Sequence, residues 1–129
     1  MYLNNFKVKD KICEFTINLS KKYSDSYKKS CNYAELDLSL IHPTELSTLA
    51  LKEYLKRYPI PNGSIHMSQE IEVLNNIPHN SILTCEVILE SSKEIKDRKI
   101  IVITTNAKNK SSKIVAVSKG TLMVPLSWK

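Results

Sequence analysis

The pattern of apolar and polar positions divides the chain into an amino-terminal part with helices and a carboxy-terminal part made of strands. Residues 12–19, ICEFTINL, carry apolar side chains at nearly alternating positions, which predicts a short strand. Ser20 can cap a helix that continues to about Leu36. The apolar residues of this helix form a narrow stripe on a polar, basic background, so we expect it on the surface.

A second predicted helix covers residues 46–58 and differs from the first in its apolar content. Pro43 suits a first helical turn, and Thr44 with Glu45 suits a helix start. The apolar positions that follow cover more than one face, so we expect most of this helix to be surrounded by protein. The sequence PIPNG at 59–63 ends it, because proline cannot continue a helix and Asn-Gly favours a turn.

The remaining sequence predicts four strands, at residues 64–74, 81–91, 99–107 and 113–125. They are separated by a turn at 75–80, a polar loop at 91–98 and a turn at 108–112. Strict alternation places His66 on the face opposite Met67 and Ile71. In the next strand, alternate apolar residues indicate a sheet with one covered face, namely Leu83, Cys85, Val87 and Leu89.

This order of elements predicts a single α+β domain over residues 1–129. A curved antiparallel sheet wrapped around one long central helix would bury the apolar residues of that helix. The sheet keeps two edge strands, which favours dimerisation by edge-to-edge pairing.

Composition and charge narrow the classes of partner. The net charge is +6, but the lysines are scattered and the chain has two arginines, Arg57 and Arg98, which weighs against nucleic acid. Three explanations of the positive charge stay open: attraction to a phosphorylated small molecule, attraction to an acidic carrier protein, or a solvated surface without a partner. No apolar run could span a membrane, and the amino terminus lacks a signal-peptide pattern. Three widely spaced cysteines predict neither disulfides nor a metal site, so we expect a cytoplasmic protein.

Asp37 and His42 are the residues with the clearest catalytic potential. They lie five positions apart, just before the second predicted helix. A carboxylate and an imidazole titrate on either side of neutral pH and can share one water molecule. The free amides at a helix start can stabilise a developing negative charge nearby. Alternatively, Asp37 is a turn acid and His42 fixes the loop. Glu45 is then a first-turn glutamate favoured by the helix dipole, and His66 is a structural strand histidine.

Two segments resemble one known family. Residues 33–42, YAELDLSLIH, are similar to the motif Y-x-x-x-x-G-D-x-N-P-[IL]-H of the MaoC-like (R)-specific enoyl-thioester hydratases and dehydratases, which have the hot-dog fold. Residues 63–91 look like the hairpin that follows the central helix in that family. Leu36, Ser39 and Leu40 replace the glycine, asparagine and proline of the motif. Residues 41–51, IHPTELSTLAL, also resemble the helix start itself, so His42 could match either the catalytic or the helix-entry histidine.

The resemblance implies a hot-dog protein that acts on thioesters of coenzyme A or acyl carrier protein as a hydratase or dehydratase. It implies catalytic roles for Asp37 and His42, and substrate binding by Pro43, Thr44, Glu45 and His66. It implies no metal and no cofactor besides the coenzyme A or phosphopantetheine of the substrate, and a homodimer or higher homo-oligomer. A hot-dog acyl-CoA thioesterase and a non-catalytic acyl-thioester-binding protein or synthase component are the alternatives.

Overall fold

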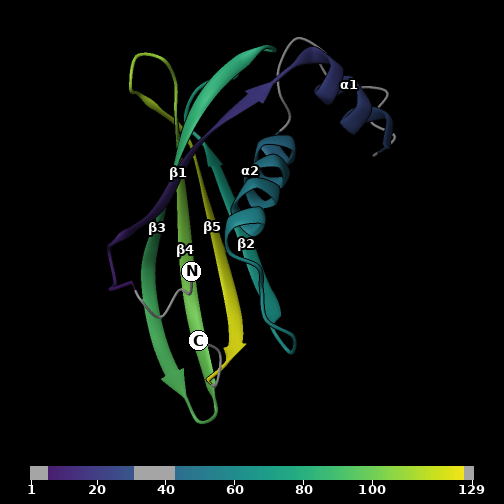
Figure 1. Ribbon diagram of the computed structural model, residues 1–129. Coiled ribbons are helices and arrows are strands. Elements are labelled where there is room, and N and C mark those ends of the chain that lie inside the picture. The colour runs from purple at the N-terminus through teal and green to yellow at the C-terminus, as the bar shows by residue number, and fades with distance from the viewer. Residues whose placement is uncertain (1–5, 31–42, 127–129) are drawn as a thin grey trace.

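The computed structural model describes residues 6–30 and 43–126. The elements follow the predicted order (Figure 1): β1 (Lys11–Leu19), α1 (Lys21–Ser30), α2 (Pro43–Arg57), β2 (Ile65–Val73), β3 (Ser81–Ile95), β4 (Arg98–Lys108) and β5 (Ile114–Pro125). The predicted extension of the first helix to Leu36 lies outside the described residues.

The strands form one antiparallel sheet of five strands in the order β1-β3-β4-β5-β2. The strands that flank the two helices in sequence, β1 and β2, therefore lie at opposite edges. The sheet is long and curved, and α2 lies along one of its faces, with α1 near the amino-terminal end of α2 (Figure 1). The predicted α+β class, a curved antiparallel sheet around a helix, is confirmed.

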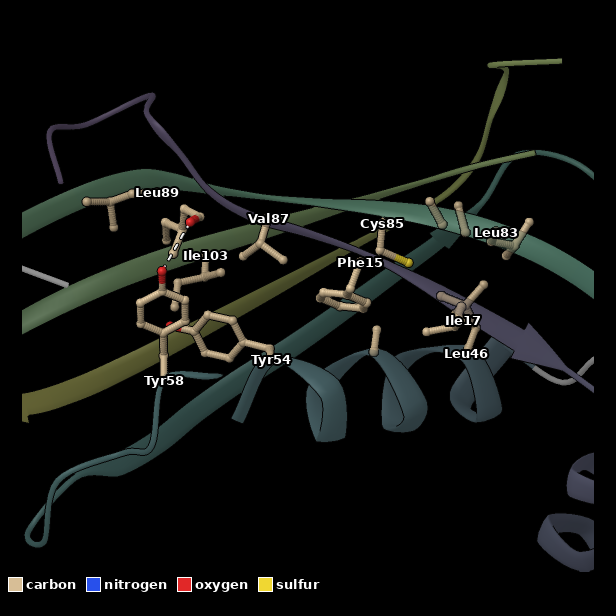
Figure 2. Close-up of a cluster of buried hydrophobic side chains, with 14 of the residues drawn as sticks. Phe15, Ile17, Leu46, Tyr54, Tyr58, Leu83, Cys85, Val87, Leu89 and Ile103 are labelled. Atoms are coloured by element: carbon tan, nitrogen blue, oxygen red, sulfur yellow. Dashed lines mark hydrogen bonds between the residues drawn. The ribbon is translucent and has the colours of Figure 1, made fainter. Parts of the chain in front are cut away.

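The main core lies between α2 and the sheet. Leu46, Ala50, Tyr54 and Tyr58 recur every four residues and are buried, as expected for one face of a helix. Figure 2 shows Leu46, Tyr54 and Tyr58 facing buried side chains of β1, β3 and β4, which include Phe15, Ile17, Leu83, Cys85, Val87, Leu89 and Ile103. The central strands thus supply the predicted covered face of the sheet.

The expectation that α2 is surrounded by protein on most sides is wrong for the single chain. Thr48, Lys52 and Lys56 are exposed and lie one turn apart on the side away from the sheet. Between the buried and exposed sides, Leu51 and Leu55 are half-buried. The difference arises because a single curved sheet covers one side of a helix and leaves the other to solvent.

The polar loop predicted at 91–98 is also wrong. Strand β3 continues to Ile95 and pairs with β4, so the turn is confined to Lys96 and Asp97, with Lys96 at a φ of 55°. The polar composition of this stretch reflects the exposure of the end of β3 and not a break in pairing. Exposed strand residues are free to be polar, which hides the strand from composition-based reasoning.

The burial of α2 predicts the result of truncating its side chains. Leu46→Ala should lower the free energy of unfolding by about 2–5 kcal/mol, because Leu46 is fully buried and its removal leaves a cavity. Thr48→Ala, two residues away on the exposed side, should change it by less than about 0.5 kcal/mol. Urea denaturation of both variants at one protein concentration measures the difference, and equal effects would contradict this orientation of the helix.

Candidate functional site

The first turn of α2 is held by side chains of α1. Glu45 is fully buried, and its Oε1 accepts a hydrogen bond of 3.1 Å from the Ser24 hydroxyl. The hydroxyls of Tyr27 and Thr44 lie 2.6 Å apart in a second hydrogen bond. The pKa of Tyr23, also in α1, is raised first by burial and then by the negative charge of Glu45. The helix predicted to lie on the surface therefore also anchors the start of α2.

A cavity of about 220 Å³ lies between α2 and the strands β2, β4 and β5. Its apolar wall includes Ala50, Leu51, Leu55, Ile60, Ile103 and Leu122. Its polar wall includes Ser47, His66, Gln69, Thr105 and Ser118. An apolar enclosure with a few polar groups on one wall is the usual composition of a small-molecule site.

Four of the polar residues are joined by hydrogen bonds along the cavity wall. The His66 Nε2 atom lies 3.0 Å from the Gln69 Oε1 atom. The Gln69 side-chain amide donates to the Ser118 hydroxyl over 2.6 Å, and that hydroxyl lies 3.2 Å from the Ser47 hydroxyl. We call these four residues the polar chain. It connects the edge strand β2 to α2 through β5.

Two local features of the strands place the polar chain. A register shift between His66 and Ser68 pairs His66 with Leu122 and Gln69 with Gly120, so both side chains face α2. Such a bulge re-aims a side chain within a strand. At Gly120, an added Cβ would lie 2.8 Å from the Gln69 Oε1 atom, so the glycine makes room for the Gln69 side chain.

The bulge also corrects the predicted orientation of His66. Because His66 and Ile71 pair with Leu122 and Ser118, four residues apart on β5, they lie on the same face of the sheet. Strict alternation had placed them on opposite faces. The extra residue of a bulge shifts the alternation by one position, and the sequence of β2 contains no glycine to indicate it.

The Tyr54 phenol, which lines the cavity, and the thiols of Cys13 and Cys85 in the sheet stay protonated at neutral pH. Burial raises the pKa of Tyr54, whose ring contacts Tyr58 and whose hydroxyl has no hydrogen-bond partner among the described residues. Burial raises the pKa of Cys85 to about 12 and also raises that of Cys13. A thiol needs to lose its proton to act as a nucleophile, so these two cysteines serve packing.

The residues predicted to form the site fall into three groups. Asp37 and His42 lie outside the described residues. Pro43 is the first residue of α2, and the side chains of Thr44 and Glu45 contact α1. Of the predicted residues that the structure describes, His66 alone is among those that line the cavity.

Sequence reasoning missed Ser47, Gln69 and Ser118. Serine and glutamine are common polar residues, and their positions on three separate elements show no spacing in the sequence. Gly120, within a predicted strand, was the available signal, since a strand glycine often marks the close approach of another group.

Among residues 6–30 and 43–126, no cluster of three or more His, Cys, Asp or Glu side chains could hold a metal ion. Within these ranges, no helix is long and apolar enough to cross a membrane.

Comparison with solved structures identifies the fold. The MaoC-like dehydratase from Rhodospirillum rubrum has 15% sequence identity and a TM-score of 0.74, with 97% of each chain covered. The unliganded R-hydratase from Pseudomonas aeruginosa has 16% identity and a TM-score of 0.71, covering 95% of this chain and 84% of that one. A hot-dog-like protein from Thermanaerovibrio acidaminovorans has 14% identity and a TM-score of 0.68, covering 97% and 89%.

The chain therefore has the hot-dog fold, as the sequence predicted, and the structures similar to it include MaoC-like dehydratases and R-hydratases. No family model and no curated protein sequence matches the chain. The similarity is thus one of fold, at sequence identities too low to carry an activity across.

Tyr54 in α2 and Tyr58 just after it have stacked rings and give a matched test of buried hydroxyl groups. Tyr58→Phe should lower the free energy of unfolding by about 0.5–1.5 kcal/mol, because the Tyr58 hydroxyl donates to the Ile12 carbonyl over 3.2 Å (Figure 2). Tyr54→Phe should leave it unchanged or raise it, because that hydroxyl is buried without a partner among the described residues. Urea denaturation compares the variants, and a larger loss for Tyr54→Phe would contradict this assignment.

Proposed function

We propose that the protein binds acyl thioesters of coenzyme A or acyl carrier protein and acts on them as a hydratase or dehydratase. The observation that carries the proposal is the cavity beside α2, in a fold like that of R-hydratases and MaoC-like dehydratases over nearly the whole chain. The acyl chain would enter this cavity. Surface lysines, part of a net charge of +6, would attract the phosphates of the carrier group.

The proposed chemistry needs a base, an acid and donors to the thioester carbonyl. Asp37 and His42 would activate water and supply the proton at the α-carbon, and the dehydration would use the same groups in reverse. The amides near Thr44 and Glu45, at the start of α2, would stabilise the enolate oxygen. Pro43 would set the backbone of that turn, and His66 would contact substrate from the cavity wall.

The substitutions in the catalytic motif favour a second candidate, a protein that binds acyl thioesters without turnover. Leu36, Ser39 and Leu40 stand where hydratases of this type carry glycine, asparagine and proline. A leucine before the aspartate restricts a backbone that glycine would leave free. Turnover of crotonyl-CoA separates the enzyme from the binding protein, and hydrolysis of saturated acyl-CoA would identify a thioesterase instead.

Substitution of the predicted catalytic pair tests the enzyme. Asp37→Asn and His42→Ala should each reduce the hydration of crotonyl-CoA by a factor of about 100 or more, because each removes a group that transfers a proton. Glu94→Gln, on the exposed end of β3, is the matched control and should retain wild-type activity. The decrease in enoyl absorbance measures the rate, and full activity in either variant would contradict the proposed roles.

We further propose that two copies pair through β2. This strand pairs with β5 alone among the described strands, and large apolar side chains are exposed on it and just beyond it: Ile65, Met67, Val73 and Leu74. An exposed edge strand with apolar side chains favours pairing with another chain. A second copy there would also cover the half-buried leucines of α2.

Charge at this edge should break the assembly. Met67→Lys combined with Val73→Lys should convert a dimer to a monomer, because lysine at an edge strand opposes pairing with an identical strand. Ile82→Lys is the control, since Ile82 is also exposed but belongs to the interior strand β3. Light scattering after size-exclusion chromatography gives the mass, and an unchanged mass for the double variant would rule out β2 as the interface.

A further inference from the structure

Strand β2 has one long side without a neighbouring strand among the described elements. It pairs with β5 on its other side and lies at the margin of the sheet (Figure 1). A second copy of β2 can add here in antiparallel orientation, related to the first by a twofold axis. Directly opposite residues of such a pair lie on the same face of the sheet. The axis therefore passes between one residue and its own equivalent, and this residue fixes every other pair.

Two glutamates exclude the second half of β2 as the position of the axis. Glu70 and Glu72 pair with Lys119 and Val117 of β5, so they lie on the same face of the sheet. An axis at either glutamate would set that residue against itself, and an axis at Ile71 would set Glu70 against Glu72 twice. Like charges directly opposite each other oppose pairing. An axis farther along would pair only the end of the strand.

The bulge and the length of β2 exclude positions nearer its start. The strand covers Ile65–Val73, and the bulge lies between His66 and Ser68. An axis at Ser68 or earlier would bring the two bulges together, where the ladder is disrupted, and would leave the end of each strand unpaired. Gln69 is the middle residue of β2. An axis there pairs the whole strand and sets each bulge against a regular part of the other copy.

The neighbours that an axis at Gln69 creates are compatible. On one face, Ser68 lies opposite Glu70 of the second copy, and its hydroxyl can donate a hydrogen bond to that carboxylate. Symmetry gives this pair twice. On the other face, the two Gln69 side chains start side by side but lean apart, because each Oε1 atom lies 2.8 Å from the place of a Cβ at Gly120 on β5. They therefore do not compete for the same space.

We propose that two copies of this chain pair through β2 with the twofold axis between their Gln69 residues, so that Ile71 of each copy covers part of the polar chain of the other. Ile71 pairs with Ser118 and faces α2, as Gln69 does. In the dimer it is a diagonal neighbour of Gln69 of the other copy and lies opposite the bulge beside His66. This inference rests on the proposed pairing through β2 and not on the proposed activity.

The second copy completes the wall of the cavity at β2. His66 and Gln69 line the cavity, yet both are exposed in the single chain. Ile71 of the second copy adds an apolar side chain beside them. The polar chain then lies between the two copies, and each copy contributes a residue to the site of the other.

Cysteine cross-linking of the full chain tests the position of the axis. Opposite residues have Cα atoms about 4.5–5.5 Å apart, within the disulfide range of about 4.4–6.8 Å, whereas diagonal residues are about 7–8 Å apart. In a Cys31→Ser background, Gln69→Cys should therefore form a disulfide-linked dimer on mild oxidation. Ser68→Cys and Glu70→Cys should not, because neither residue opposes itself. The Cys31→Ser protein alone gives the baseline.

A mixture of the Ser68→Cys and Glu70→Cys proteins is the matched test, since it leaves Gln69 in place. These two positions oppose each other in the proposed dimer. After exchange of subunits, the mixture should form disulfide-linked heterodimers at least about ten times more than either variant alone forms homodimers. A tag on one variant identifies the heterodimer by its mass on a non-reducing gel.

Charge at Ser68 tests the same register without cysteines. Ser68→Lys should tighten the dimer by about 3- to 10-fold, because it sets a positive charge opposite Glu70 in two symmetric pairs. Ser68→Glu should weaken it by a similar factor, because it sets like charges opposite each other. Analytical ultracentrifugation measures the dissociation constants, and equal effects of the two substitutions would contradict the proposed register.

The outcomes separate the position of the axis from the pairing on which it rests. Cross-linking at Gln69 and in the mixture would support the inference, with or without turnover of crotonyl-CoA. A dimer that Met67→Lys with Val73→Lys disrupts, but that cross-links through Ser68→Cys or Glu70→Cys alone, would keep the pairing through β2 and overturn the axis at Gln69. A monomeric wild-type protein in light scattering would overturn both.

Discussion

The structure depends on the packing of one helix face against one sheet. Leu46, Ala50, Tyr54 and Tyr58 share one core with buried side chains of the sheet. The same contact fixes the site, since the residues beside this face, Ser47 and Leu51, are carried to the cavity by the rotation of the helix. Core and cavity thus overlap on one side of α2, where Ala50 and Tyr54 belong to both, and a change that rotates the helix would disturb both.

Much of the fold could be predicted from the sequence because each element has a strong local pattern. Two features depend only on residues close in sequence and were predicted correctly. They are the alternating burial from Leu83 to Leu89 and the turn at residues 59–63. The end of β3 was missed because its polar residues from Ser91 onward are exposed, and exposure permits any polar residue. The burial of α2 was overestimated because the pattern of apolar residues does not distinguish contact with the same chain from contact with a second one.

The site was less predictable, for a physical reason. The polar chain joins residues from β2, β5 and α2, and its hydrogen bonds depend on a bulge that shifts the facing of His66. A bulge is a property of the pairing of two strands and is therefore invisible along one of them. The predicted motif residues Asp37 and His42 lie outside the described part of the chain, so their roles stay predictions. Gly120 shows that an unusual residue in a strand can report a nearby group, here the Gln69 side chain.

His66 and Gln69, two members of the polar chain, lie on β2, and this has a consequence for how a ligand would reach the cavity. Nearly all side chains of β2 are exposed, and the strand is bonded to a neighbour on one side only within the described chain. Segments with little burial open at a lower free energy than the whole molecule does. Local opening of β2 at the margin of the sheet would therefore widen access to the cavity, while the helix and the inner strands stay folded. A partner that covers β2 would then also control access to the cavity.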